Sequence, residues 1–318
     1  MATSGTSTFT RTRDQIITDA ARKIRAIRAG EVMGARMLQD FAAGLNSMVK
    51  AWQARGLHVW TRAEATLFPQ VGQTRYALAA TGADHCTLSY VATTLSAAEA
   101  SGQTALSVTD DAGIANADHI GIVLDNGNLF WSTVSGTPAS DVVTISNALT
   151  SAAASGNAVY AYTSRIVRPL RVVEARRYNV SSGRDTQLVD PMALLDYRRL
   201  PNKTQSGTVT QVCYDPSLTT GYLYLWLTPA NLNDLIKFTW WRPIEDFNAA
   251  GDNADLPQEW IRAITFNLAV DMSPEFSVPR DVMEGQFGVG TLAREYLEEV
   301  SGFDREAEPT YFGVDMTG

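Results

Sequence analysis

The sequence predicts an α+β protein in which helices from both ends of the chain form one discontinuous core around a β-rich middle. Helical periodicity in residues 1–57 and 255–300 is the first observation that favours this class. Short alternating runs between turn signals in residues 58–254 are the second. The chain has 318 residues, 45% of them hydrophobic and 19% charged, which is typical of a globular protein with about two domains. No run of about 18 apolar residues occurs, and the Ser/Thr-rich start lacks an apolar signal core, so we expect neither a membrane span nor a secretory signal.

Two helices are predicted near the start of the chain. Thr12 and Gln15 have the spacing of a capping box, and the apolar stripe that follows reaches Ile27 before Gly30 offers a stop. A second helix is expected over residues 31–55. Its large apolar side chains recur every three or four residues, as expected of a face that packs on another helix. They are Leu38, Phe41, Leu45, Met48 and Trp52.

Two β regions are predicted in the middle of the chain. Residues 58–83 with 164–254 form a β-rich region, within which Asp190-Pro191 is expected to start a short helix. Residues 84–163 form an inserted module, expected to be a small β-barrel or sandwich. Its expected strands are 105–108, 120–124, 129–134, 142–145 and 158–162. Asn126-Gly127 predicts a hairpin between two of these strands.

The inserted module contains a near repeat. LSAAEASG at residues 95–102 resembles LTSAAASG at residues 149–156. Two copies are too few for a solenoid, so we interpret them as a recurrent turn within one β unit.

The chain is predicted to return to helix at its end. One helix is expected from Gln258 to Met272, with Pro274 ending it. A last helix is expected over residues 278–300, where Gly285, Gly288 and Gly290 can interrupt it. Residues 301–318 are acidic, carry aromatic residues and are expected to order on a partner.

Charge is distributed unevenly along the chain. The net charge is −8, which disfavours general coating of nucleic acid. Residues 1–60 hold nine basic and four acidic residues, whereas residues 251–318 hold four basic and fourteen acidic ones. These opposed ends can pair with each other or with a neighbouring copy, or can be ordinary solvated helix faces.

Residue patterns of enzyme and metal sites are not found, and we expect no enzyme, no cofactor and no metal. His58, His85 and His119 form no paired metal motif, and Cys86 and Cys213 are expected to be buried in a reducing compartment. The adjacent carboxylates Glu298 and Glu299 point in different directions on a helix, which is poor geometry for a glycosidase pair. Asp110 and Asp111 lack the spacing of a calcium loop and are expected to lie in a turn.

An arginine cluster is the main candidate for an interface. Arginine pairs well with carboxylates and phosphates, so the cluster can contact DNA phosphates, the acidic tail of a neighbouring copy, or acids of its own chain. We favour the neighbouring copy, because the acidic partner is present in this sequence. The residues assigned to contacts between copies are Arg165, Arg168, Arg171, Arg176, Arg177, Arg198 and Arg199, together with Trp52 and Trp260.

Three segments carry a family resemblance. They are LNSMVKAWQARG at residues 45–56, TLF at 66–68 with the following GQ at 72–73 and Tyr76, and PQEW at 257–260 continuing through NLA at 267–269 to SPEF at 273–276. Together, in this order, they resemble the head-to-tail adaptors of tailed bacteriophages, also called tail accessory factors or head completion proteins. The β module resembles an insertion of larger members.

The resemblance implies a structural protein. Such adaptors form a ring, usually of twelve copies, beneath the portal protein, join it to the tail or nozzle and keep the DNA channel continuous for genome ejection. It implies a virion protein assembled in the host cytoplasm, with no membrane partner. The segment 301–318 is then the portal-docking tail, with Glu308, Tyr311, Phe312 and Met316 as its contacts.

Two alternatives remain open. One is another tail or baseplate subunit that binds a fibre or receptor through the β module. The other is a peptidoglycan hydrolase that uses a carboxylate such as Glu298.

Overall fold

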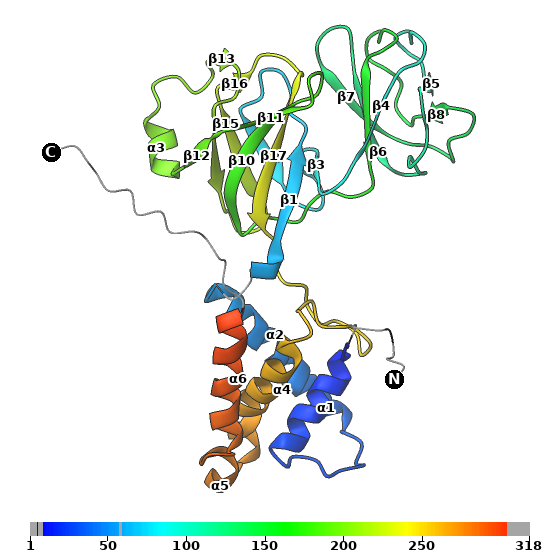
Figure 1. Ribbon diagram of the computed structural model, residues 1–318. Helices are drawn as coiled ribbons and strands as arrows, with labels where there is room; N and C mark the ends of the chain where they lie inside the picture. Colours follow the sequence, from blue (N-terminus) through cyan, green and yellow to red (C-terminus); the bar gives the residue numbers. More distant parts are fainter. Residues whose placement is uncertain (1–4, 6–8, 57–58, 304–318) are drawn as a thin grey trace, which may run out of the picture. The chain divides into compact units, whose positions relative to one another are not determined.

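The chain folds into two compact units that contain helices and β-sheets respectively. The computed structural model describes residue 5, residues 9–56 and residues 59–303 (Figure 1). Met1–Thr61 and Ile244–Gly318 make up the first unit, and Arg62–Pro243 makes up the second. The presence of both helices and several sheets confirms the α+β class.

Helices from both ends of the chain build the first unit. The longer helices are α1 (Arg13–Lys23), α2 (Ala35–Ala54), α4 (Trp260–Met272) and α6 (Val289–Phe303). Short turns of helix are η1 (Val59–Thr61), η2 (Ser273–Phe276) and α5 (Arg280–Met283). Helix α4 packs against α1, α2 and α6, and Figure 1 shows it beside these helices.

Several helix ends differ from the sequence prediction. The capping box of Thr12 and Gln15 is present, but α1 stops at Lys23, because Arg25 takes a left-handed conformation before Gly30 is reached. Helix α2 begins after Gly34, whose extended backbone precedes the first helical residue. The last predicted helix is divided into α5 and α6, with Gly285 at φ +97° in the break, so the possible glycine interruption is confirmed.

The core of this unit mixes residues that lie about 200 positions apart in sequence. Trp52 packs on Trp260 with ring centroids 5.7 Å apart, and Phe41 packs on Phe276 at 5.5 Å. Ile244 and Phe247 are also buried in this core. The segment that follows residue 243 therefore belongs with the helices, and the prediction that residues 244–254 are part of the β-rich region is wrong.

Two antiparallel-rich sheets enclose the main core of the second unit. The five-stranded sheet has the order β11-β10-β17-β1-β3, and the four-stranded sheet has the order β12-β14-β15-β2. The first sheet comprises β1 (Arg62–Leu67), β3 (Cys86–Thr87), β10 (Arg171–Asn179), β11 (Arg184–Gln187) and β17 (Asp234–Trp241). The second comprises β2 (Arg75–Leu78), β12 (Val189–Met192), β14 (Gln211–Asp215) and β15 (Gly221–Trp226). Leu67, Phe238 and Trp240 of one sheet share a buried cluster with Tyr76 and Leu223 of the other.

The short helix predicted at Asp190-Pro191 begins later than expected. Both residues lie in β12, an edge strand, where a proline costs no ladder hydrogen bond on its open side. Helix α3 (Leu194–Arg199) follows, with Ala193 at the N-cap position. A small parallel pair, β13 (Ser206–Gly207) and β16 (Thr228–Pro229), completes this region.

The inserted module is made of two small sheets. One has the order β4-β9-β6-β7, and the other is the pair β5-β8. Their strands are β4 (Val91–Thr94), β5 (Ala105–Ser107), β6 (His119–Val123), β7 (Leu129–Thr133), β8 (Val142–Thr144) and β9 (Ala158–Tyr162). Isolated bridges link Leu95 to Val108 and Val134 to Ile145, but the ladders do not close into a barrel. The five expected strands are all present, and β6 and β7 form the hairpin predicted at Asn126-Gly127.

The two copies of the repeat pair with each other. Glu99 and Ala153 exchange both backbone hydrogen bonds, at 2.8 and 2.9 Å. Gly102 N–H donates to the carbonyl of Leu149 in one direction, and Gly156 N–H donates to the carbonyl of Leu95 in the other, both at 2.8 Å. The repeat is therefore a reciprocal pair of turns related by a local two-fold arrangement.

Candidate interaction surfaces

One face of the five-stranded sheet carries a row of charged side chains. Strand alternation turns Phe238 and Trp240 of β17 into the core, so Lys237, Thr239 and Trp241 lie on the opposite face. Neighbouring strands add residues in register with these positions. The outer sheet face, as we call it, consists of Arg62 and Glu64 on β1, Arg171, Glu174 and Arg176 on β10, Asp185 and Gln187 on β11, and Lys237, Thr239 and Trp241 on β17.

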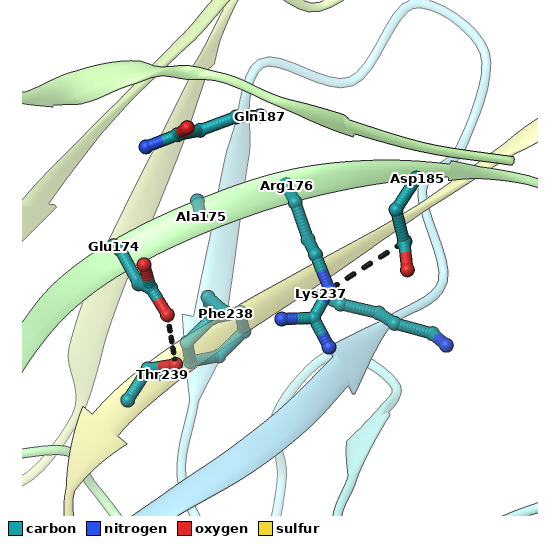
Figure 2. Close-up of a pocket in the computed structure, with 8 residues that line it drawn as sticks. All are labelled: Glu174, Ala175, Arg176, Asp185, Gln187, Lys237, Phe238 and Thr239. Carbon is teal, nitrogen blue, oxygen red and sulfur yellow. Dashed lines mark hydrogen bonds and ion pairs between the residues drawn. The ribbon is translucent and has the colours of Figure 1, made fainter.

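Arg176 lies at the centre of a charge network on this face (Figure 2). Its guanidinium forms ion pairs with Glu64 and, at 3.5 Å, with Asp185. The Thr239 hydroxyl donates to Glu174 at 2.8 Å. The side chains of Glu64 and Asp185 are 45% and 46% exposed, so both acids stay open to solvent. A hollow of about 240 Å³ is lined by Glu174, Arg176, Asp185 and Thr239, together with neighbouring residues of β10, β11 and β17.

The other basic side chains of the outer sheet face lie against aromatic rings. Lys237 Nζ lies 4.0 Å from the ring centroid of Tyr178. Arg171 and Arg62 lie 5.4 and 5.9 Å from the Trp241 ring. Such contacts keep long basic side chains extended along the sheet while their charges face solvent. The face is thus an exposed polar surface that carries charges of both signs.

Several of the predicted interface arginines are paired within the chain. Besides Arg176, Arg177 lies 3.2 Å from Asp234 and Arg199 lies 3.6 Å from Asp196. These three arginines therefore pair with acids of their own chain, which is the third possibility that the sequence left open. Arg198 differs from them, because it is exposed and has no ion pair within the described part of the chain.

Arg165 and Arg168 contact tyrosines. Arg168 lies beside the hydroxyl of Tyr214, which donates a hydrogen bond to the Pro169 carbonyl. Burial raises the pKa of that hydroxyl to about 12, although the arginine acts in the opposite direction. Arg165 lies beside Tyr162, whose pKa is likewise raised by burial. Both arginines are half-buried, so only part of each guanidinium is left for another copy.

Trp52 and Trp260 require a correction. They were assigned to contacts between copies, but they are 4% and 1% exposed and lie in the core of their own unit. The apolar stripe of α2 packs against α4 of the same chain, so neither tryptophan ring is accessible to a neighbouring copy.

An aromatic cluster surrounds His85. Its ring stacks on Trp131 with a centroid distance of 3.7 Å, and its Nδ1 lies 2.6 Å from the Tyr162 hydroxyl. Burial, with smaller contributions from Arg165 and His119, lowers the pKa of His85 to about 3. The ring is therefore neutral near pH 7 and serves packing. Burial also lowers the pKa of His119, whereas His58 lies outside the described residues.

Both cysteines are buried and free, as predicted. Burial raises the pKa of Cys213 to about 11 and that of Cys86 well above its usual value. Neither thiol has the character of a reactive nucleophile.

Within the described residues, three carboxylates come together that sequence spacing does not predict as a group. Asp141 joins Asp110 and Asp111, with carboxylate oxygens within 4.8 Å of one another. Thirty residues separate Asp111 from Asp141, so no local spacing could reveal this group. Glu298 and Glu299 both lie exposed on α6, without the apolar enclosure that a general acid needs.

The remaining predicted contacts, Glu308, Tyr311, Phe312 and Met316, lie outside the described residues. None of the described helices is long and apolar enough to cross a bilayer. Comparison with protein-family models gave no match, and comparison with curated proteins gave none either.

Proposed function

We propose that this chain is a non-enzymatic, ring-forming head-to-tail adaptor of a tailed bacteriophage. It binds the portal protein on one side and a tail or nozzle protein on the other, at the portal vertex of the virion, and leaves the DNA channel open. The ring is expected to contain about twelve copies, as the resemblance implies, and to be assembled in the host cytoplasm before genome ejection.

One observation supports this proposal above the others. The two helical segments whose motifs resemble adaptors, residues 45–56 and 257–276, pack on each other although a whole β unit separates them in sequence. The Asn46 side chain of the first segment also bonds the backbone of Phe247, at 2.9 and 3.1 Å. A helical core interrupted by β insertions is what the resemblance implies.

The exposed polar surface supports contacts with copies or partners. The outer sheet face and the exposed Arg198 offer charge to a neighbour. Contacts of this kind set orientation and register more than affinity, as a closed ring requires.

Electron microscopy of the purified chain, alone and mixed with portal protein of the same phage, tests the proposal. We expect rings that cap the portal. Removal of residues 304–318 should abolish portal attachment while the remaining chain still folds, which thermal unfolding followed by circular dichroism checks. The proposal fails if no ring forms with portal present, or if labelled protein maps to a site away from the capsid vertex.

A charge reversal tests the contact between copies. Arg198→Glu should weaken ring formation because it places a like charge opposite the acidic partner. Arg75→Glu on β2 is the matched control, since Arg75 is also exposed, belongs to the same unit as Arg198 and was not assigned to an interface. Equal ring formation by the two variants would remove Arg198 from the interface.

A further inference from the structure

A basic groove runs between α1 and α4 of the helical unit. It encloses about 550 Å³. Its lining includes Arg22 and Lys23 of α1, Arg11 just before α1, Arg262 and Phe266 of α4, and the ring of Phe9. Phe9 is 56% exposed and has Arg11 over its ring, at 5.5 Å, so the groove offers an apolar surface beside positive charge.

Acidic residues do not neutralise this groove. Asp19 is the acid in its lining, and it is shared by Arg11 at 3.9 Å and Arg22 at 3.7 Å. Lys23 lies 4.8 Å from the Phe266 ring, and Arg262 lies 3.8 Å from the Tyr296 ring. Within residues 9–56 and 59–303, neither Lys23 nor Arg262 forms an ion pair, so both cations are available to an anionic ligand.

The sequence beyond α6 has the complementary chemistry. Residues 304–318 contain Asp304, Glu306, Glu308 and Asp315 against the single basic residue Arg305. The same segment contains the neighbouring rings of Tyr311 and Phe312. An acidic peptide with an aromatic anchor is the ligand that four cations around two phenylalanine rings would recognise.

The starting point of this segment is close to the groove. Helix α6 packs along α4, where the Tyr296 ring contacts Phe266 at 5.0 Å and its hydroxyl accepts a hydrogen bond from Arg262. Phe303, the last residue of α6, follows Tyr296 by two helical turns. Fifteen further residues can span about 50 Å when extended. Attachment to the same helical unit also gives the segment a high effective concentration at the groove.

We propose that the groove between α1 and α4 binds residues 304–318 of the same chain. The acidic side chains lie against Arg22, Lys23 and Arg262, and an aromatic ring of the segment packs on Phe9 or Phe266. The same segment is the portal-docking tail of the proposed function, so groove and portal would compete for it. The test below uses the chain without portal, and its outcome is therefore distinguishable from failure of the adaptor role.

Zero-length carbodiimide cross-linking of the full chain tests this contact. The reagent joins a carboxylate to an amine in direct contact, and the lysines are only Lys23, Lys50, Lys203 and Lys237. Peptide mass spectrometry should find acids of residues 304–318 joined to Lys23 in large excess over the other lysines. Lys23→Arg should remove these products while it keeps the charge. Absence of products at Lys23, or equal yields at the other lysines, would overturn the proposal.

A charge reversal separates specific docking from random encounter. Arg262→Glu should lower the yield at Lys23 about tenfold, equivalent to about 1.4 kcal/mol. Arg280→Glu on α5 is the matched control, because Arg280 is exposed on the same unit and lies outside the groove. Circular dichroism establishes that both variants are folded. Equal losses in the two variants would show that general charge rather than the groove governs the contact, against the proposal.

Isotope mixing distinguishes the same chain from a second copy. Cross-linking an equal mixture of ¹⁵N-labelled and unlabelled protein should give products of one isotope only. Mixed-isotope products would overturn docking within the chain and assign the groove to the tail of a neighbour.

Discussion

Asn46 ties the two sequence-distant halves of the helical unit together. Its side-chain amide donates to the Phe247 carbonyl at 3.1 Å, and its oxygen accepts from the Phe247 N–H at 2.9 Å. Asn46→Ala removes both bonds and should lower the free energy of unfolding by about 1–3 kcal/mol. Denaturant titration followed by circular dichroism measures this loss. Gln39→Ala, at an exposed position of the same helix, should cost little, and equal stability of the two variants would contradict the assigned role.

His85 should make stability depend on pH. Its pKa is lowered to about 3, whereas the unfolded residue titrates near its ordinary value of about 6.5. As the pH falls from about 6.5 towards 3, the unfolded chain binds the proton first, so stability is lost across this window and is fully present above it. His85→Gln should flatten the stability profile between about pH 6 and 4, by less than about 1.4 kcal/mol per pH unit. Denaturant midpoints measured over this range test it, and an unchanged slope in the variant would count against it.

The paired turns of the inserted module should respond equally to equivalent substitutions. Gly102 and Gly156 both have φ +89°, and each donates to a leucine carbonyl of the other turn. An alanine at either position must adopt a left-handed conformation, which costs about 1–2 kcal/mol. We expect Gly102→Ala and Gly156→Ala to lower the unfolding free energy by similar amounts. Gly251→Ala is the control, because Gly251 has no positive φ and no atom within 4 Å of an added Cβ. If only one of the two turn substitutions lowered the unfolding free energy, the turns would not be equivalent.

Strands and helices differ in how well local patterns locate their ends. The five module strands were predictable because alternation and turn residues such as Asn126-Gly127 act within a few positions. Helix ends were less predictable, since Arg25 ends α1 through a left-handed backbone that no residue preference requires. Asp190-Pro191 carries a helix-start signal, yet both residues lie in an edge strand because the open side of β12 tolerates proline.

The two units of the chain should fold separately. The first and last paired positions of the β unit, Arg62 and Trp241, are direct partners in adjacent strands, so the points where the chain enters and leaves this unit are neighbours. Joining Thr61 to Ile244 through a short Gly/Ser linker should give a helical protein that unfolds cooperatively. Residues 62–243 should form a β protein by themselves. Circular dichroism and calorimetry test both, and a joined helical chain without a cooperative transition would contradict this division.

Local patterns were sufficient to predict the mixed α+β class, the module strands and the amphipathic face of α2, because periodicity and turn chemistry depend on neighbouring residues. The contacts that these strands and helices make could be known only from the tertiary structure. It placed Trp52 against Trp260 inside one unit, paired Arg176 and Arg177 with acids of their own chain, and brought Asp141 to Asp110. These contacts join residues that are far apart in sequence, and the pairing of distant segments depends on how whole faces are buried together rather than on any local spacing.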